Sequence, residues 1–184
     1  MSRRRNGPDE DLEEIRYSYR PASGELRVLF VGESPPKWPG GFFYTGDSTL
    51  LRCMVPVLVE ELGFPEEPEA FLERFRESGF YIEDFSHVRG FKPARDPDGS
   101  ETRAGVERIA GLIGEEEPQV VLGVLSGKAF QGLVEDAVAA SACPETPWRC
   151  LRFPFHKDPD AQDAFKYQLT RAIRDFELGA EGGR

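Results

Sequence analysis

The sequence predicts a three-layer α/β/α domain built around a central four-stranded parallel sheet. Short apolar runs of strand length alternate with longer segments of helical pattern, and this alternation favours a parallel sheet with helices on both faces. The first run, residues 26–31 (LRVLFV), is apolar almost throughout, as expected of a strand covered on both faces. A chain of 184 residues with 14 Phe and 39% hydrophobic residues can fill one core of this kind.

The sequence of the first half of the domain predicts two strands and two helices. After the strand at 26–31, a helix is expected from about 47 to 62, with Asp47 or Ser48 as its N-cap and Gly63 as its stop signal. A second, acidic helix is expected over about 67–78, followed by a strand at 80–85 (FYIEDF).

The second half repeats the alternation. We expect a helix over 101–113, a strand over 119–125, a helix from 126–127 to about 139, and a short strand over 149–153. Asp158 is placed to cap a last helix that has Pro159 at its first position and runs to about Phe176.

The ends of the chain differ from its middle. Residues 1–20 have mixed charge and few apolar positions, which predicts a flexible N-terminal arm before a single domain at 21–178 and a loose tail at 179–184. The N-terminus lacks the apolar stretch of a signal peptide, and no segment has the ~18 consecutive apolar residues of a membrane helix. We therefore expect a cytoplasmic monomer.

The cysteines give no sign of a metal site. Cys53, Cys143 and Cys150 are odd in number and form no CxxC pattern, so we expect free thiols, no metal and no cofactor.

Charge is distributed unevenly. A net charge of −10 argues against a protein that coats nucleic acid, because phosphate contacts need cations. Residues 86–95 nevertheless hold Arg89, Lys92 and Arg95 without an acid, and residues 143–157 hold three cations against Glu145 alone. The pattern allows a local basic face on an acidic body.

In parallel α/β sheets the ligand lies beyond the carboxyl ends of the strands, which selects the loops at 32–44, 86–99, 126–128 and 154–158. The first of these begins Gly32-Glu33-Ser34-Pro35-Pro36. Glycine permits a tight turn and the prolines stiffen it, so Glu33 is held in place. Its carboxylate could activate water or stabilise a cation, or it could only cap a backbone amide.

Two features near the first two strands have both a structural and a functional interpretation. Phe43, in Phe42-Phe43-Tyr44, could stack on a base or form a hydrophobic plug under the loop. Asp84 lies near the end of the second strand, where an acid is an unusual structural choice. Alternation places Glu83 and Asp84 on opposite faces of the strand, and His87 is expected at the surface or facing DNA.

The last two loops offer further candidates, of which His156 could also be accidental. His156 lies two residues before the expected N-cap Asp158, where the helix dipole favours a neutral imidazole that could stabilise a leaving base. The segment GVLSGK does not have phosphate-loop spacing. Its Ser126 and Lys128 could hold one phosphate at a helix N-terminus, or mark an ordinary strand–helix junction.

Taken in order, these loops resemble the uracil-DNA glycosylase superfamily, in the style of members with a GEAPG loop. Gly32-Glu33-Ser34-Pro35-Pro36 resembles that loop, and Phe43 resembles its base-stacking Phe. Tyr81-Ile82-Glu83-Asp84 is similar to the strand that ends in a base-reading Asn. Residues 118–133 (PQVVLGVLSGKAFQGL) resemble the family's strand–turn–helix, and residues 153–158 resemble the region ending in HPS.

The sequence also departs from that family. It lacks the cysteine pair of the iron–sulfur members, so no cluster is expected, and the loop between Pro36 and Phe43 is shorter. Lys157-Asp158 replace the Pro-Ser after the family's His, and Asp84 stands where an Asn is expected.

The resemblance implies a metal-free hydrolase that cleaves the N-glycosidic bond of uracil or a related base flipped out of single- or double-stranded DNA. Glu33 would orient water or stabilise the sugar cation, Asp84 would read the base, and His156 would stabilise the departing anion. The base would contact Gly32, Ser34, Pro35 and Phe43, and the phosphates would contact Ser126, Lys128, Arg89, Lys92 and Lys157. The alternatives are a glycosylase-fold protein that binds a nucleobase, nucleotide or DNA without cleaving it, and an enzyme of free nucleosides.

Overall fold

A four-stranded parallel sheet forms the centre of the molecule, with the strand order β2-β1-β3-β4. The structure, a computed structural model, describes residues 10–45, 47–125 and 127–179. The strands are β1 (Val28–Gly32), β2 (Phe80–Asp84), β3 (Val120–Leu125) and β4 (Trp148–Arg152). The predicted fold class is confirmed.

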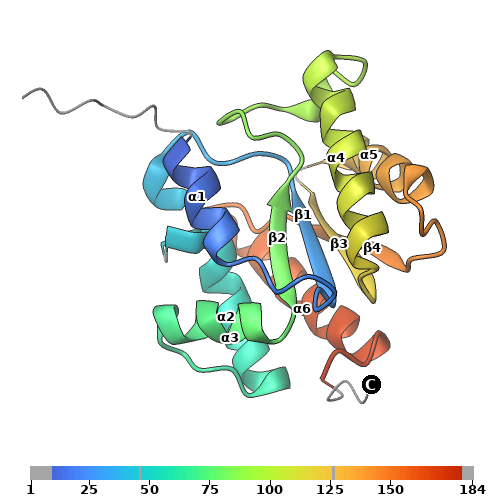
Figure 1. Cartoon of the computed structure of the whole chain (residues 1–184). Helices are drawn as coiled ribbons and strands as arrows, with labels where there is room; N and C mark the ends of the chain where they lie inside the picture. The colour runs from blue at the N-terminus through green and yellow to red at the C-terminus, as the bar shows by residue number, and fades with distance from the viewer. Residues whose placement is uncertain (1–9, 46, 126, 180–184) are drawn as a thin grey trace, which may run out of the picture.

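Helices cover both faces of this sheet (Figure 1). On one face α4 and α5 pack together, while α2 contacts α6 and α3 contacts β2 on the other. The helices are α1 (Glu10–Ser18), α2 (Thr49–Leu62), α3 (Pro68–Glu77), α4 (Ser100–Glu116), α5 (Lys128–Ala140) and α6 (Pro159–Asp175). Short 3-10 turns lie at η1 (Pro39–Gly41), η2 (Phe43–Thr45) and η3 (Pro93–Arg95). Within the described residues, no helix is long and apolar enough to cross a membrane.

The helix boundaries follow the predicted capping signals. Ser48 caps α2 by accepting a hydrogen bond from the backbone N–H of Leu51 at 2.9 Å, and Gly63 ends that helix at a φ of 67°. Asp158 caps α6 by accepting from the N–H of Ala161 at 3.0 Å, ahead of Pro159 in the first turn.

The core lies on both sides of β1, whose residues Val28, Leu29, Phe30 and Val31 are completely buried. Phe30 packs against Phe75 and Phe80 on one face of the sheet, and Phe85 packs against Phe130 of α5. The continuous apolar run of the first strand is thus explained by helices on both faces.

The N-terminal segment differs from the flexible arm predicted over residues 1–20, because residues 10–18 form helix α1, which packs on the domain. Leu12, Ile15 and Tyr19 belong to or pack against the core, and Arg16 is only 3% exposed. These positions follow the i, i+3, i+4, i+7 spacing of one helix face, which the mixed charge of the segment conceals. Residues 1–9, and residues 180–184 of the predicted tail, lie outside the described residues.

Candidate functional site at the ends of β1 and β2

The two strand-end carboxylates lie on neighbouring strands. Gly32 pairs with Asp84 in the parallel register of β1 and β2, so Glu33 follows β1 beside the end of β2. A Cβ atom on Gly32 would lie 2.5 Å from Oδ1 of Asp84, so any larger residue would force this carboxylate to shift. Glu33 and Asp84 are each 8% exposed.

Asp84 is paired with Arg16 of α1. Nη2 of Arg16 donates to Oδ2 of Asp84 at 2.6 Å, and Nη1 lies 3.4 Å from Oε1 of Glu83. The guanidinium carbon lies 5.4 Å from the centre of the Phe42 ring, within the range of a cation–π contact. A planar cation therefore lies against an aromatic ring and between two buried carboxylates.

The contact of Arg16 with both acids corrects the expectation that Glu83 and Asp84 serve opposite faces. The side chain of Glu83 folds back along the strand end, where its Oε1 accepts from the backbone N–H of Asp84 at 2.9 Å. Strand alternation fixes the direction of the Cα–Cβ bond, but a glutamate side chain is long enough to turn from there.

The two acids differ in their protonation behaviour. Burial raises the pKa of Asp84 to about 6, although Arg16 favours the carboxylate. Burial also opposes the charge on Glu83, but the hydrogen bond with His87 and the charge of Arg16 outweigh it and lower the pKa of Glu83. Asp84 is therefore the acid that gains a proton on mild acidification.

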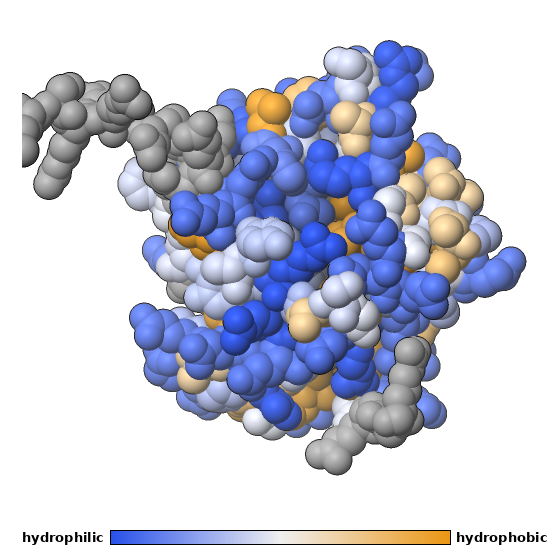
Figure 2. Space-filling model, in the orientation of Figure 1, coloured by the Kyte–Doolittle hydropathy of each residue, from blue (hydrophilic) through white to orange (hydrophobic). Residues whose placement is uncertain are grey.

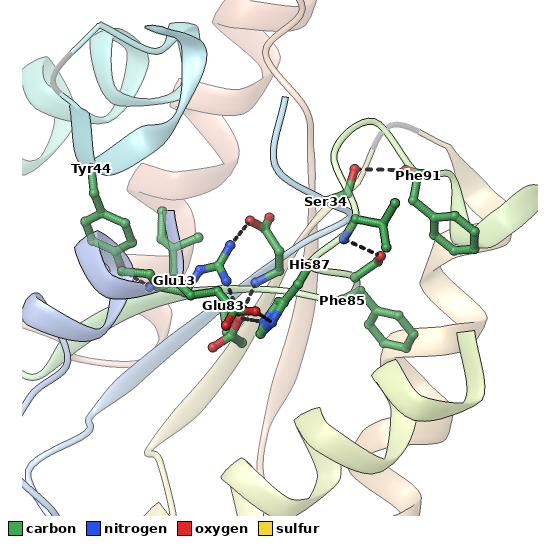
Figure 3. A network of polar contacts seen from close by, with 12 residues as sticks. Glu13, Ser34, Tyr44, Glu83, Phe85, His87 and Phe91 are labelled. Atoms are coloured by element: carbon green, nitrogen blue, oxygen red, sulfur yellow. Dashed lines mark hydrogen bonds and ion pairs between the residues drawn. The ribbon is translucent and has the colours of Figure 1, made fainter. Parts of the chain in front are cut away.

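His87 connects α1 to β2 (Figure 3). Its Nδ1 lies 2.6 Å from Oε1 of Glu13, and its Nε2 lies 2.9 Å from Oε1 of Glu83. Both ring nitrogens thus have carboxylate partners, and the side chain is 29% exposed. His87 has a structural role in this arrangement.

A groove of about 690 Å³ runs beside this cluster, between α1, β2 and α4. Its walls include Arg16, Glu83 and His87, and hydrophilic residue types predominate on this face of the molecule (Figure 2). Its lining does not include Glu33, Phe43, Asp84 or His156. Within the described part of the chain, no group of three or more His, Cys, Asp or Glu side chains is placed to hold a metal ion.

Glu33 lies in a loop that is tied to the loop after β2. Oε2 of Glu33 lies 2.8 Å from Nζ of Lys92. The hydroxyl of Ser34 donates to the carbonyl of Phe91 at 2.8 Å (Figure 3), and the N–H of Gly90 donates to the carbonyl of Pro35 at 2.8 Å. These contacts hold Glu33 in place, as its stiff sequence context predicts.

The aromatic segment is packed inside the protein. Phe43 is 5% exposed, and its ring contacts Tyr44 and Phe75 at centroid distances of 5.1 and 5.3 Å. This is the plug arrangement that the sequence also allowed. The neighbouring ring of Phe42 lies under the guanidinium of Arg16, the partner of Asp84. Base stacking by Phe43 remains a prediction that requires this segment to open.

The remaining candidates lie apart from this pair. His156 and Lys157 are exposed in the loop after β4, and β3 lies between β4 and β1 in the sheet. Lys128 is exposed at the first position of α5, Arg89 is half-buried, and Ser126 lies outside the described residues. Of the predicted residues, Gly32 pairs with Asp84 and Glu33 contacts Lys92. The roles of all the predicted residues remain predictions.

Arg16 is the site residue that sequence reasoning missed. Its signal is its position four residues after Leu12 and one after Ile15, on the apolar stripe of α1. A cation on such a stripe needs a buried acid as its partner, and Asp84 was the unusual acid at a strand end.

No protein-family model matches this chain, and no curated protein matches its sequence. Among solved structures, the chain is similar to a mutant of the uracil-DNA glycosylase UNG from Nitratifractor salsuginis. The TM-score is 0.47 with 14% sequence identity, over 84% of this chain and 74% of that one. A likeness at this level carries no information about activity.

Proposed function

We propose that the protein binds a base extruded from DNA at the carboxyl ends of β1 and β2 and hydrolyses its N-glycosidic bond. The observation that carries the proposal is the pair of Glu33 and Asp84. They are two buried carboxylates at the ends of neighbouring parallel strands, and each contacts a cationic side chain. Buried, oriented acids at this edge of an α/β sheet are typical of a ligand site.

Glu33 is the group that would act on the sugar. Hydrolysis of a glycosidic bond passes through a sugar with oxocarbenium character, which a fixed carboxylate can stabilise or to which it can direct water. Lys92 holds one oxygen of Glu33 at 2.8 Å and leaves the group oriented. Because hydrogen bonds of Ser34 and Pro35 join this loop to the loop after β2, the Glu33 side chain would need little reorganisation for the reaction.

Asp84 would read the edge of the base. An ionised carboxylate only accepts hydrogen bonds, so it favours a base that presents an amino group and repels the carbonyl of uracil. With a pKa raised by burial to about 6, Asp84 becomes protonated in mildly acidic solution. It can then donate as well as accept, as an Asn amide does, so the choice of base should depend on pH.

The exposed cations would contact the DNA backbone. Lys92, Lys128 and Lys157 lie at the carboxyl edge of the sheet or just beyond it, and His156 precedes the N-terminus of α6. In this proposal His156 stabilises the departing base. DNA binding is weak because the net charge is −10, and it decreases with salt because the contacts to phosphates are ionic.

The ion pair of Arg16 with Asp84 favours a second candidate, a protein that binds a nucleobase, nucleotide or DNA without cleaving it. In the structure the guanidinium occupies the hydrogen-bonding edge of Asp84, so any base at this position must displace Arg16. Displacement of an arginine is compatible with binding but adds a barrier to turnover.

A panel of substrates separates these functions. Single strands and duplexes carrying one uracil, hypoxanthine, xanthine or mismatched thymine are incubated with the protein and cleaved with alkali, and free nucleosides are scored alongside. We expect strand breaks that Glu33→Gln abolishes and that Glu66→Gln, at an exposed glutamate between α2 and α3, retains. Binding without strand breaks would support the second candidate, and cleavage of nucleosides alone would refute DNA as the substrate.

A further inference from the structure

Trp38 is a large aromatic side chain left facing solvent. It is 72% exposed and lies in the connection between β1 and η1. A Cβ atom on Gly40 would lie 2.7 Å from Nε1 of the indole, and one on Gly41 would lie 3.8 Å from its Cδ1. The indole therefore lies against a bare glycine backbone, which supports it while most of its surface faces water.

The loop that carries Trp38 is anchored. Pro35 accepts a hydrogen bond from the N–H of Gly90 at 2.8 Å, and the aliphatic stem of Lys37 lies over Gly90, which has a φ of 68°. A Cβ atom on Gly90 would collide with that stem. The Trp38 ring is therefore carried by an anchored loop, and fixing its position on binding would cost little conformational entropy.

The charge around Trp38 has the opposite sign from the protein as a whole. Residues 34–46 and 86–95, the two loops that are tied together, contain Lys37, Arg89, Lys92 and Arg95 and no Asp or Glu, in a chain of net charge −10. Lys37 and Arg95 are exposed, and the side chain of Lys92 is 46% exposed. Val88, 52% exposed, adds a second apolar side chain to the same loops.

An exposed ring among cations matches a partner that is anionic and offers flat aromatic faces. Nucleic acid has both properties, and an unpaired base can stack on an aromatic side chain whatever its sequence. A second copy of this acidic chain fits less well, because these loops would need an acidic surface that also accepts an indole.

We infer that Trp38 is a stacking platform for an unpaired base of a nucleic acid strand, held next to the carboxyl ends of β1 and β2. The inference builds on the proposed function, since it places a strand beside Glu33. Trp38 acts here as a positioning residue: it holds the strand and does not contact the bond to be cleaved.

The chain has two tryptophans, which gives a direct test. In Trp148→Phe, Trp38 is the only tryptophan, and its fluorescence is followed while a single-stranded oligonucleotide of about 12 nucleotides is added at low salt. We expect quenching that is reversed by added salt. In the wild-type background, affinity measured by fluorescence anisotropy of a labelled strand should fall about tenfold in Trp38→Ala and much less in Trp38→Phe.

Tyr17→Ala provides a matched control. Tyr17 is also 72% exposed, but it lines the groove beside Glu13, Glu14 and Glu115. We expect Tyr17→Ala to leave the affinity unchanged. Absence of quenching in Trp148→Phe, or equal losses in Trp38→Ala and Tyr17→Ala, would overturn the inference. A change of oligomeric state in Trp38→Ala without a change in affinity would overturn it in favour of a second copy.

The inference and the proposed function can fail separately. Base excision that does not depend on Trp38, with no quenching, leaves the function standing and refutes the platform. Quenching and loss of affinity without excision of any base support the platform and refute the hydrolase.

Discussion

Replacing Arg16 by Ala tests the buried ion pair that connects α1 to β2. The substitution removes the cation that lies 2.6 Å from Asp84 and 3.4 Å from Glu83, and it leaves both carboxylates at most about one-tenth exposed. It also removes the cation–π contact with Phe42.

Removing one partner of a buried ion pair typically lowers the free energy of unfolding by about 3–5 kcal/mol, because the remaining charge is left buried and uncompensated. Asp84 can relieve part of this cost by taking up a proton, since burial already raises its pKa to about 6 with Arg16 in place. We therefore expect Arg16→Ala to lower the free energy of unfolding by about 3 kcal/mol near neutral pH, a large fraction of a typical domain's stability.

The pH dependence has a definite sign. When the folded pKa of an acid lies above its unfolded value, the folded state binds more protons, and stability decreases as the pH rises through the folded pKa. Without Arg16 the pKa of Asp84 should rise further, and Glu83 loses one of the three groups, with His87 and Arg108, that lower its pKa. The loss in free energy of unfolding caused by Arg16→Ala should therefore be small near about pH 5 and larger near about pH 8.

Urea denaturation of both proteins at the two pH values measures this difference. Asp84→Asn in the Arg16→Ala background should restore much of the lost stability, because it removes the uncompensated charge. Arg52→Ala, which breaks an exposed pair with Asp47, serves as the control and should change little. A loss below about 1 kcal/mol in Arg16→Ala that does not vary with pH would refute the buried-pair argument.

Three further predictions concern the same strand ends. Single-turnover excision of uracil by the wild type should be slow near about pH 8 and faster below the Asp84 pKa of about 6. The Asp84→Asn variant should excise uracil fast at both pH values. If the wild type is active at pH 8 and Asp84→Asn abolishes that activity, Asp84 is instead the water-activating base. Gly32→Ala should lower the free energy of unfolding by about 1–3 kcal/mol in a urea titration, because its Cβ would lie 2.5 Å from Asp84, whereas Gly111→Ala in α4, with open space around it, should not destabilise the fold. Duplex affinity should fall steeply between low and moderate salt, and Lys92→Ala should reduce the steepness measured by fluorescence anisotropy; an unchanged slope would exclude Lys92 as a phosphate contact.

The strands and most helices could be predicted because their signals are local. The caps Ser48 and Asp158 and the stop at Gly63 each act within a few residues, and the apolar strands follow from burial on both faces. Helix α1 could not be predicted in this way. Its stability depends on Asp84 and His87, which lie far along the chain, and its own composition is that of a solvated segment.

The candidate site was predicted in part for the same reason. Strand ends are local features, and the parallel register brings neighbouring ends together, so Gly32, the residue before Glu33, pairs with Asp84. Hydrophobic periodicity could have marked Arg16 as a buried cation, but its pairing with Asp84 and the choice between Phe42 and Phe43 depend on tertiary packing.

The attachment of α1 also has a consequence for the order of folding during synthesis. Residues 10–18 leave the ribosome early, but the partner of Arg16 lies 68 residues further along the chain. A nine-residue helix is marginal in water by itself, so α1 should stay unformed until β1 and β2 have paired. Helix α1, which precedes both strands in the chain, then docks only after they have paired. Protease sensitivity confined to α1 would accordingly report whether the ends of β1 and β2 have assembled.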